Sequence, residues 1–332
     1  MGRWLVLGGT RFLSWTVAAT AVERGHEVVC AARGVSGRVP DGAKLVAVDR
    51  DAPDGLDALR GERFDAVVDV ATMSLPWVRA AVDALAAGAG HWTFVSTINI
   101  YADSAARGQG VDAPLLPPRE AADTDVPNSD PDAYGAIKVA SENAVRAAAG
   151  DSALVVRAGL ICGPGDEHDR FGYWPQRLAR GGRAVVPDSP GQPVQVVDVR
   201  DLADWIVRCG EERTTGTFDG SGQRSTLGAV LDEIADAVGA HELERIPVAP
   251  EKLTAAGVNP WAAPRSLPLW LPESHWGMVD RDTAPAAAAG LRCRPVADTA
   301  RASLDHERSL GVDRDRRAGL TPQDEAEILA TL

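Results

Sequence analysis

Two residues spaced four apart, Tyr134 and Lys138, could together transfer a proton. They lie in a segment of helical pattern, where this spacing places the phenol and the ammonium on one face. A cation beside a phenol favours the phenolate, so we expect the pKa of Tyr134 to move from about 10 toward neutral pH. Such a tyrosine can exchange a proton with a carbonyl or an alcohol, and the hydroxyl of Thr97 could hold the same oxygen. The spacing also occurs in helices where both residues are structural, so it predicts chemistry only together with other signals.

A glycine-containing turn between the expected strand Arg3–Leu7 and the expected helix Phe12–Arg24 is a candidate phosphate site. Gly8 would let the helix N-terminus present free N–H groups and its dipole to a pyrophosphate. The full dinucleotide fingerprint has three spaced glycines, but here the second and third positions hold Arg11 and Ser14. The alternative is a tight turn that binds no ligand. Its place after the first strand of a βαβ unit favours dinucleotide binding.

The end of the second expected strand, Glu27–Ala32, bears on the choice of dinucleotide. A site specific for NAD usually has an acidic residue there, which accepts hydrogen bonds from the ribose, whereas this chain has Arg33. A guanidinium matches a 2′-phosphate in charge and geometry, and Arg11 and Arg38 could assist. We therefore predict that NADP(H) is the preferred cofactor and that NAD(H) is possible. The alternative is that Arg33 is a solvated loop charge.

The first half of the sequence alternates short β-branched runs with helical patterns, which is typical of a parallel sheet built from βαβ units. We predict an α/β fold, a doubly wound parallel sheet of the Rossmann type with a smaller C-terminal substrate lobe. The NAD(P)-binding domain should cover 1–165, with later elements near 190–220 returning to it, and the substrate lobe should cover mainly 166–332. The expected strands are Arg3–Leu7, Glu27–Ala32, Lys44–Val48, Ala66–Val70, His91–Ser96, Leu154–Arg157, Ala184–Val186 and Val194–Val197. The expected helices are Phe12–Arg24, Leu75–Ala87, Ala133–Ala148 (with Asp130-Pro131 at its start), Phe171–Arg180, Leu202–Cys209, Leu227–Val238 and Pro295–Leu310.

Composition limits the classes of partner. The chain has 332 residues and a formal net charge of -13, spread along its length, which disfavours nucleic acid. The four widely spaced cysteines indicate free thiols in a reducing compartment, and the six histidines form no metal-binding motif, so we predict no metal. No apolar run approaches the roughly 20 residues of a membrane span, and the start does not resemble a secretory signal. We expect a cytoplasmic protein, a monomer or homodimer, whose partner is a small-molecule substrate.

In combination, these motifs resemble the extended short-chain dehydrogenase/reductase family, often labelled NAD-dependent epimerase/dehydratase. The resemblance extends from residue 3 to about residue 310. It rests on the glycine turn, Asp49, Val70-Ala71, Ser96-Thr97 with Ile100-Tyr101, Tyr134 with Lys138, and Arg157 followed by Gly163-Pro164. The segment Gly9–Leu13 is similar to a branch of the family in which arginine replaces the middle glycine.

The resemblance implies roles by position. Tyr134 would be the acid/base, Lys138 would lower its pKa and hold the nicotinamide ribose, and Thr97 would bind the reacting oxygen. Asp49 would meet the adenine. With Tyr134 and Lys138, the expected cofactor contacts are Gly8, Thr10, Arg11, Phe12, Leu13, Arg33, Asp49, Arg50, Val70, Ala71, Ala158, Gly159 and Leu160.

The substrate side shows a departure from the family. Members that act on nucleotide-diphosphate sugars tend to carry an arginine where this chain has Val194, so a principal diphosphate clamp would be missing. Arg170 and the following aromatics could form one wall of a pocket, although aromatics in such segments also serve as core or lid packing. Arg265 could replace the missing clamp, and His168 could equally be a surface residue. The candidate substrate contacts are Ser96, Asn99, His168, Tyr173, Trp174, Gln195, Trp261 and Arg265.

These signals favour an enzyme, an NADP(H)-dependent reductase or dehydrogenase of a small carbonyl or alcohol that uses the Thr97, Tyr134 and Lys138 set. An alternative is epimerisation or dehydration of a sugar-like or nucleotide-sugar substrate through a transient keto intermediate. A third hypothesis is a non-catalytic dinucleotide-binding or RNA-associated protein. The intact catalytic set argues against that third hypothesis, and the acidic balance argues against RNA.

Overall fold

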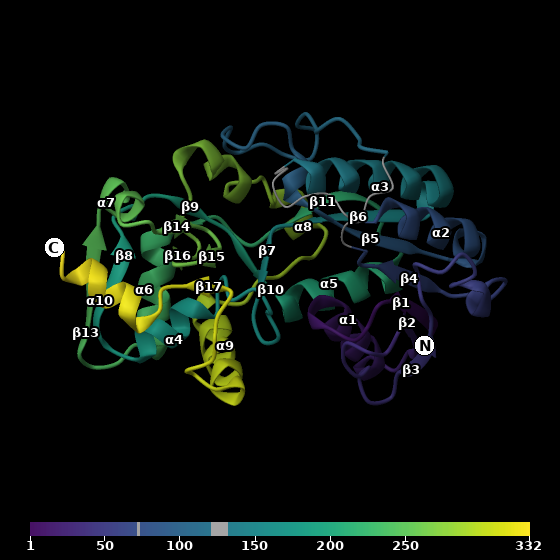
Figure 1. Ribbon diagram of the computed structural model, residues 1–332. Helices are drawn as coiled ribbons and strands as arrows, with labels where there is room; N and C mark the ends of the chain where they lie inside the picture. The colour runs from purple at the N-terminus through teal and green to yellow at the C-terminus, as the bar shows by residue number, and fades with distance from the viewer. Residues whose placement is uncertain (72–73, 121–131) are drawn as a thin grey trace.

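A seven-stranded parallel sheet forms the centre of the molecule (Figure 1). The computed structural model describes residues 1–71, 74–120 and 132–332. The strand order is β11-β6-β5-β4-β1-β2-β3, and every pairing within it is parallel. The strands are β1 (Arg3–Leu7), β2 (Glu27–Ala32), β3 (Lys44–Ala47), β4 (Ala66–Asp69), β5 (Trp92–Thr97), β6 (Ala153–Ala158) and β11 (Gly216–Gly220). The predicted doubly wound Rossmann sheet is confirmed.

Helices cover both faces of this sheet, which explains why its strands are apolar on both sides. On one face α1 (Phe12–Glu23) and α5 (Val199–Glu212) pack against alternate strand residues such as Val6 and Val68. On the other face α2 (Leu75–Leu85) and α3 (Ala133–Ala149) lie over the intervening residues, such as Leu5. The sheet and these four helices are called the first lobe below.

The strand order reverses between β1 and β4, which continue to opposite edges of the sheet. Loops that leave the carboxyl ends of two such strands diverge and open a crevice, where α/β proteins bind their ligands. The glycine turn follows β1, and Val70 with Ala71 follows β4. The topology therefore places several of the predicted cofactor residues around one crevice.

A second lobe lies to the left of the sheet in Figure 1. Its parallel pair, β8 (Gly182–Pro187) and β13 (Leu243–Val248), packs with helices around a second apolar core. These helices are α4 (Tyr173–Ala179), α6 (Leu227–Val238), α7 (Pro250–Ala255), α9 (Val296–Leu310) and α10 (Pro322–Leu329). The parallel pair β7 (Leu160–Cys162) and β10 (Val196–Asp198) lies between the lobes. The remaining elements are β9 (Pro193–Val194), β12 (Ser225–Thr226), β14 (Asn259–Pro260), β15 (Ala263–Pro264), β16 (Ser266–Leu267), α8 (Ala284–Ala288) and β17 (Ala318–Gly319).

Predicted and observed elements of the first lobe agree within two residues, apart from α5, which extends three residues beyond the predicted helix at each end, and one added strand. Strand β11, of sequence Gly-Thr-Phe-Asp-Gly, was not among the predicted strands because glycine and aspartate are depleted in strands. The pair Asp130-Pro131 lies outside the described residues. The predicted division of the chain at residue 165 stays a prediction.

The predicted strand Val194–Val197 is wrong, because the chain forms two short strands with different partners. Val194 pairs with β12, whereas Val196 pairs with Leu160 of β7. Gln195 separates them, and its amide is held by the backbone of two other segments. The following helix also begins earlier than predicted, at Val199, because the Asp198 side chain caps it. Among the described residues, no helix has the length and apolarity needed to cross a bilayer.

Candidate active site

Thr97 and Tyr134 meet at the carboxyl edge of the sheet. Thr97 is the last residue of β5, and its hydroxyl accepts the backbone N–H of Asn99 at 3.2 Å. Tyr134 lies in the first turn of α3, close enough to Thr97 for the threonine hydroxyl to act on the pKa of its phenol. The structure therefore brings together the two hydroxyls that were predicted to handle one substrate oxygen.

The close approach of α3 to β5 depends on Gly135. A Cβ at this position would lie 2.1 Å from the carbonyl oxygen of Asn99 and 2.7 Å from Cδ1 of Leu116. Real Cβ atoms do not approach backbone so closely, so any side chain here would push the helix away. Gly135 thus sets the distance between Tyr134 and Thr97.

Lys138 is buried one turn further along α3. Its Nζ donates to the carbonyl oxygens of Ala71 at 2.5 Å and Val95 at 2.6 Å, and lies 4.7 Å from the centroid of the Phe94 ring. Burial lowers the pKa of Lys138 to about 8, although the carboxylates of Asp69 and Glu142 act in the opposite direction. The ammonium thereby links the loop that follows β4 to strand β5. The linked part of this loop is the part that lines the crevice.

The predicted lowering of the Tyr134 pKa is wrong for this structure. Burial raises the pKa of the phenol, and the opposing influences are the hydrogen bond from Thr97 and the charge of Arg170. Lys138 is not among the groups that act on it, because its ammonium is directed at two backbone carbonyls. The phenol is therefore protonated at neutral pH in this conformation.

The turn after β1 has the geometry of a phosphate cradle. Gly8 and Gly9 have φ of 123° and 93°, and a Cβ on Gly9 would lie 2.4 Å from Sγ of Cys30. In the described part of the chain, no side chain caps the N-terminus of α1 and no acidic residue lies in its first turn. The hydroxyl of Ser14 donates to the carbonyl of the N-cap residue Arg11 at 2.8 Å and does not accept a hydrogen bond from the first amides of the helix. The first amides of α1, at Phe12 and Leu13, are therefore available to an anionic ligand.

The cavity beside this turn fits the adenosine half of a dinucleotide. It has a volume of about 270 Å³ and is lined by Leu7, Gly8, Thr10, Ala31, Ala32, Arg33, Ser36, Val48, Asp49, Arg50, Val70, Ala71 and Trp77. Arg50 is not a free cation there, because it binds Asp69 with two hydrogen bonds of 2.8 and 2.9 Å. Arg33 is exposed at the rim. The uncapped helix N-terminus, the glycine cradle and this cavity together fit a nicotinamide dinucleotide.

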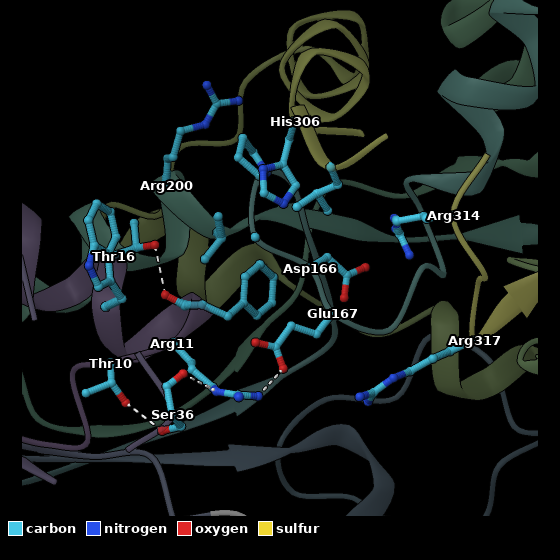
Figure 2. Close-up of a pocket in the computed structure, with 16 residues that line it drawn as sticks. Thr10, Arg11, Thr16, Ser36, Asp166, Glu167, Arg200, His306, Arg314 and Arg317 are labelled. Carbon is cyan, nitrogen blue, oxygen red and sulfur yellow. Dashed lines mark hydrogen bonds and ion pairs between the residues drawn. The ribbon is translucent and has the colours of Figure 1, made fainter. Parts of the chain in front are cut away.

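A larger cavity, about 830 Å³ in volume, opens between the lobes beside the same turn (Figure 2). Arg11 lies along its floor, where its guanidinium donates to the Ser36 carbonyl at 2.9 Å and pairs with Glu167 at 2.7 Å. Arg317 extends into the cavity from the opposite wall. The arginine that replaces the middle glycine of the fingerprint thus links the cofactor turn to the second lobe.

The remaining predicted cofactor residues lie at the end of β6. Ala158 is the register partner of Thr97 in the neighbouring strand. Gly159 packs against Ser221, since a Cβ there would lie 2.2 Å from its hydroxyl oxygen, and Leu160 begins β7. Their position beside Thr97 is compatible with the predicted contact to nicotinamide.

Several residues that were predicted as substrate contacts have side chains that bind or pack against other parts of the chain, and their contact with substrate stays a prediction. Tyr173 and Trp174 are buried in the core of the second lobe, and the Trp174 indole donates to the carbonyl of Pro268 at 2.7 Å. Gln195 makes three hydrogen bonds to backbone, described above. Arg265 forms ion pairs with Asp324 and Glu327 beside α10.

The other candidates differ in exposure. Ser96 is buried, whereas Asn99 and His168 are exposed. Trp261 lies over the guanidinium of Arg170, at 5.7 Å from ring centroid to Cζ. Asp166, a buried carboxylate in the same loop as Arg170, was not predicted. A charged residue after Gly163-Pro164-Gly165 suggests a solvated loop, and only the packed lobes show that this loop is covered.

The family follows from comparison with known proteins. The model of the NAD dependent epimerase/dehydratase family matches residues 4–218. The chain therefore belongs to this family, and it is an enzyme of the short-chain dehydrogenase/reductase type. None of the curated proteins matches the sequence significantly.

Solved structures with the same fold include three bacterial proteins. The Bordetella bronchiseptica enzyme WbmH in complex with NAD+ is 19% identical, with a TM-score of 0.67, over 94% of this chain and 100% of the other. A Thermus thermophilus UDP-glucose 4-epimerase complex with NAD is 19% identical, with a TM-score of 0.63, over 92% and 99%. A UDP-N-acetylglucosamine 4-epimerase from Bacillus cereus is 16% identical, with a TM-score of 0.64, over 94% and 100%. At these sequence identities, the similarity to the solved structures shows that the chain shares their fold.

Proposed function

We propose that the protein oxidises a secondary hydroxyl of a sugar-like substrate to a transient ketone and then completes an epimerisation or dehydration. The observation that carries this proposal is the proximity of the Thr97 hydroxyl to the Tyr134 phenol, at the carboxyl edge of the sheet next to the cofactor crevice. The family match supports this chemistry, as do the solved relatives, which include a UDP-glucose 4-epimerase in complex with NAD and a UDP-N-acetylglucosamine 4-epimerase.

In this proposal each residue has a defined task. Thr97 holds the substrate oxygen by a hydrogen bond, and Tyr134 exchanges a proton with that oxygen at its phenolic Oη. The amides of Phe12 and Leu13 bind the pyrophosphate, and Lys138 holds the loop at Ala71 against β5. A bound nicotinamide would supply the acceptor and donor of a hydride.

A net reductase is the second candidate, and one observation favours it. Burial keeps the Tyr134 phenol protonated at neutral pH, and a protonated phenol is ready to donate to a carbonyl oxygen. An oxidation must first remove that proton. The same residues would then serve a reaction that consumes reduced cofactor.

The dinucleotide carried by the purified protein distinguishes these two functions. The protein is denatured, and the released nucleotide is identified and quantified by chromatography. Tightly retained, mainly oxidised dinucleotide is the result expected for the epimerase or dehydratase. Readily exchanged reduced dinucleotide would indicate the reductase, and a protein that binds neither NAD(H) nor NADP(H) would contradict both.

We also propose that the substrate lacks a nucleotide diphosphate. Val194, at the position of the family's arginine clamp, is buried in the second apolar core, and Arg265 is held by two carboxylates. A thermal-shift screen should therefore show no stabilisation by UDP- or dTDP-sugars in the presence of NADPH. Strong stabilisation that is lost in Arg265→Ala would contradict this proposal.

The preferred cofactor in this proposal is NADP(H), because Arg33 stands at the rim of the adenosine cavity. NAD(H) remains the alternative, and it is the cofactor named for the solved relatives. From the sequence we further propose a cytoplasmic monomer or homodimer.

A further inference from the structure

Arg170 is a half-buried cation that, among the described residues, has no anionic partner in contact. It lies in the loop between β7 and α4, and its Nε is buried without a hydrogen-bond acceptor. Within the described residues, its guanidinium takes part in no hydrogen bond and no ion pair. Burial lowers the pKa of Arg170, which reflects the cost of keeping this charge away from water. A buried donor that lacks an acceptor is costly, so the Nε of Arg170 indicates a ligand that supplies the acceptor.

The residue before it shows that the loop is held in place by other groups. Asp169 is buried and adopts φ of 61°, and its carboxylate pairs with Arg314 and Arg316 and accepts the N–H of Arg317 at 2.8 Å. These contacts with the C-terminal segment fix the loop without using Arg170. The guanidinium of Arg170 is therefore positioned by the fold and left free for another role.

The ring of Trp261 lies beside this guanidinium. The ring centroid lies 5.7 Å from Cζ, and the backbone of Trp261 has φ of 65°, which a bulky residue rarely adopts. A guanidinium presents its N–H groups as a rigid fork in one plane. This arrangement favours a planar, two-oxygen acceptor at the edge of the guanidinium, which is the geometry of a carboxylate.

Asp166, four residues earlier in the same loop, has one oxygen without a hydrogen-bond donor among the described residues, just as the Nε of Arg170 lacks an acceptor. It is 5% exposed, and its Oδ1 accepts the N–H of His168 at 2.9 Å. Its Oδ2 is buried and has no donor within the described residues. The charges of Asp166 and Arg170 act on each other, but within the described part of the chain the two groups form no ion pair. A ligand that offers a hydroxyl to Asp166 and an acceptor to Arg170 would satisfy both.

The loop also lies against the proposed reaction centre. The charge of Arg170 acts on the Tyr134 phenol. A Cβ at Gly165 would lie 3.5 Å from Cδ2 of Phe12, so the start of the loop covers the glycine turn. A group bound by Arg170 would therefore belong to the same molecule whose hydroxyl meets Thr97 and Tyr134.

We propose that Arg170 binds a carboxylate of the substrate while Asp166 accepts a hydrogen bond from a nearby hydroxyl, so that the substrate is a polyhydroxylated acid of the sugar-acid class. The ring of Trp261 packs beside this guanidinium. The inference rests on the proposed function, because it concerns the substrate of the same site.

Calorimetric titration with two ligands of equal shape tests this inference without turnover. D-glucuronate carries the carboxylate, and D-glucuronamide replaces it with a neutral amide. In the presence of saturating NADP+, wild-type protein should bind glucuronate at least ten-fold more tightly than the amide, since a charge-assisted pair is worth more than about 1.4 kcal/mol when buried. Equal affinities for the two ligands, or no binding of glucuronate, would overturn the inference.

Variants then assign the effect to the residue. Arg170→Gln should weaken glucuronate binding by about 30-fold or more while affinity for the amide changes little, because it removes the partner of a buried charge. Arg170→Lys should recover part of the loss, and the exposed Arg183→Gln should bind as wild type. Unchanged glucuronate affinity in both Arg170 variants would overturn the inference. Because no hydride transfer is measured, its failure would leave the proposed chemistry of Tyr134 intact, and failure of that chemistry would not alter these affinities.

Discussion

At the scale of single residues, burial has a larger effect on the site than the neighbouring charges that the sequence suggested. Tyr134 and Lys138 stand one turn apart on α3, yet burial shifts each toward its neutral form, raising one pKa and lowering the other. The spacing correctly identified two residues of one helix face, but their hydrogen-bond partners could not be predicted from it. Lys138 donates to backbone carbonyls of two other segments, which only the assembled sheet brings within reach.

The lowered pKa of Lys138 predicts a pH dependence of stability. Between about pH 8 and the ordinary value of 10.5, the folded chain has released the proton while the unfolded chain still holds it. The unfolded state then binds more protons, so this residue makes the free energy of unfolding rise with pH by up to about 1.4 kcal/mol per pH unit. Urea denaturation across this range should show that contribution in wild type and its loss in Lys138→Met. Parallel pH curves for the two proteins would refute the assignment.

Arg33 predicts the preference between the two dinucleotides. NADPH should bind several-fold more tightly than NADH, because the exposed guanidinium at the cavity rim can pair with a 2′-phosphate. Arg33→Asp should erase or reverse the preference in fluorescence titrations. Arg38→Asp makes the same charge change nearby, outside the cavity lining, and should have a smaller effect. An unchanged ratio in Arg33→Asp would exclude this residue as the determinant.

At the scale of elements, the approach of α3 to β5 decides whether the two hydroxyls meet. Because a Cβ on Gly135 would lie 2.1 Å from the Asn99 carbonyl, Gly135→Ala should displace the helix and destabilise the protein by about 1–3 kcal/mol, as overpacking does. Gly191→Ala is the matched control, since nothing lies within 4 Å of its added Cβ. Chemical denaturation measures both changes. Equal stability of the two variants would mean that Gly135 does not set this contact.

The regular elements of the first lobe were predictable because their signals are local. The β-branched runs and the helical patterns that follow them specify a parallel sheet without knowledge of the distant chain. Elements of the second lobe depend on distant partners instead. The sequence pattern predicts one strand that contains Val194 and Val196. In the structure they belong to two strands, because their pairing partners, β12 and β7, come from different parts of the chain.

At the scale of the whole molecule, the residues around the crevice come from both lobes. The cofactor turn belongs to the first lobe, while Asp166 and Arg170 come from the loop that leads into the second. The sequence placed Tyr173 and Trp174 on a wall of the pocket, but packing of the second lobe buries both. The same packing buries the Nε of Arg170 without an acceptor among the described residues, so the importance of this residue shows only in the folded chain.

The participation of Tyr134 in hydride chemistry is the central claim, and single-turnover kinetics test it most directly. Protein loaded with oxidised dinucleotide is mixed with a panel of polyols, aldoses and sugar acids, and the near-ultraviolet absorbance of reduced nicotinamide is followed. Wild-type protein should show reduction with at least one compound. Tyr134→Phe should slow it by about 10²-fold or more, the usual contribution of general acid–base catalysis. Tyr173→Phe removes a hydroxyl from the core of the second lobe and should react as wild type. A Tyr134→Phe protein that reacts at the wild-type rate would contradict the account.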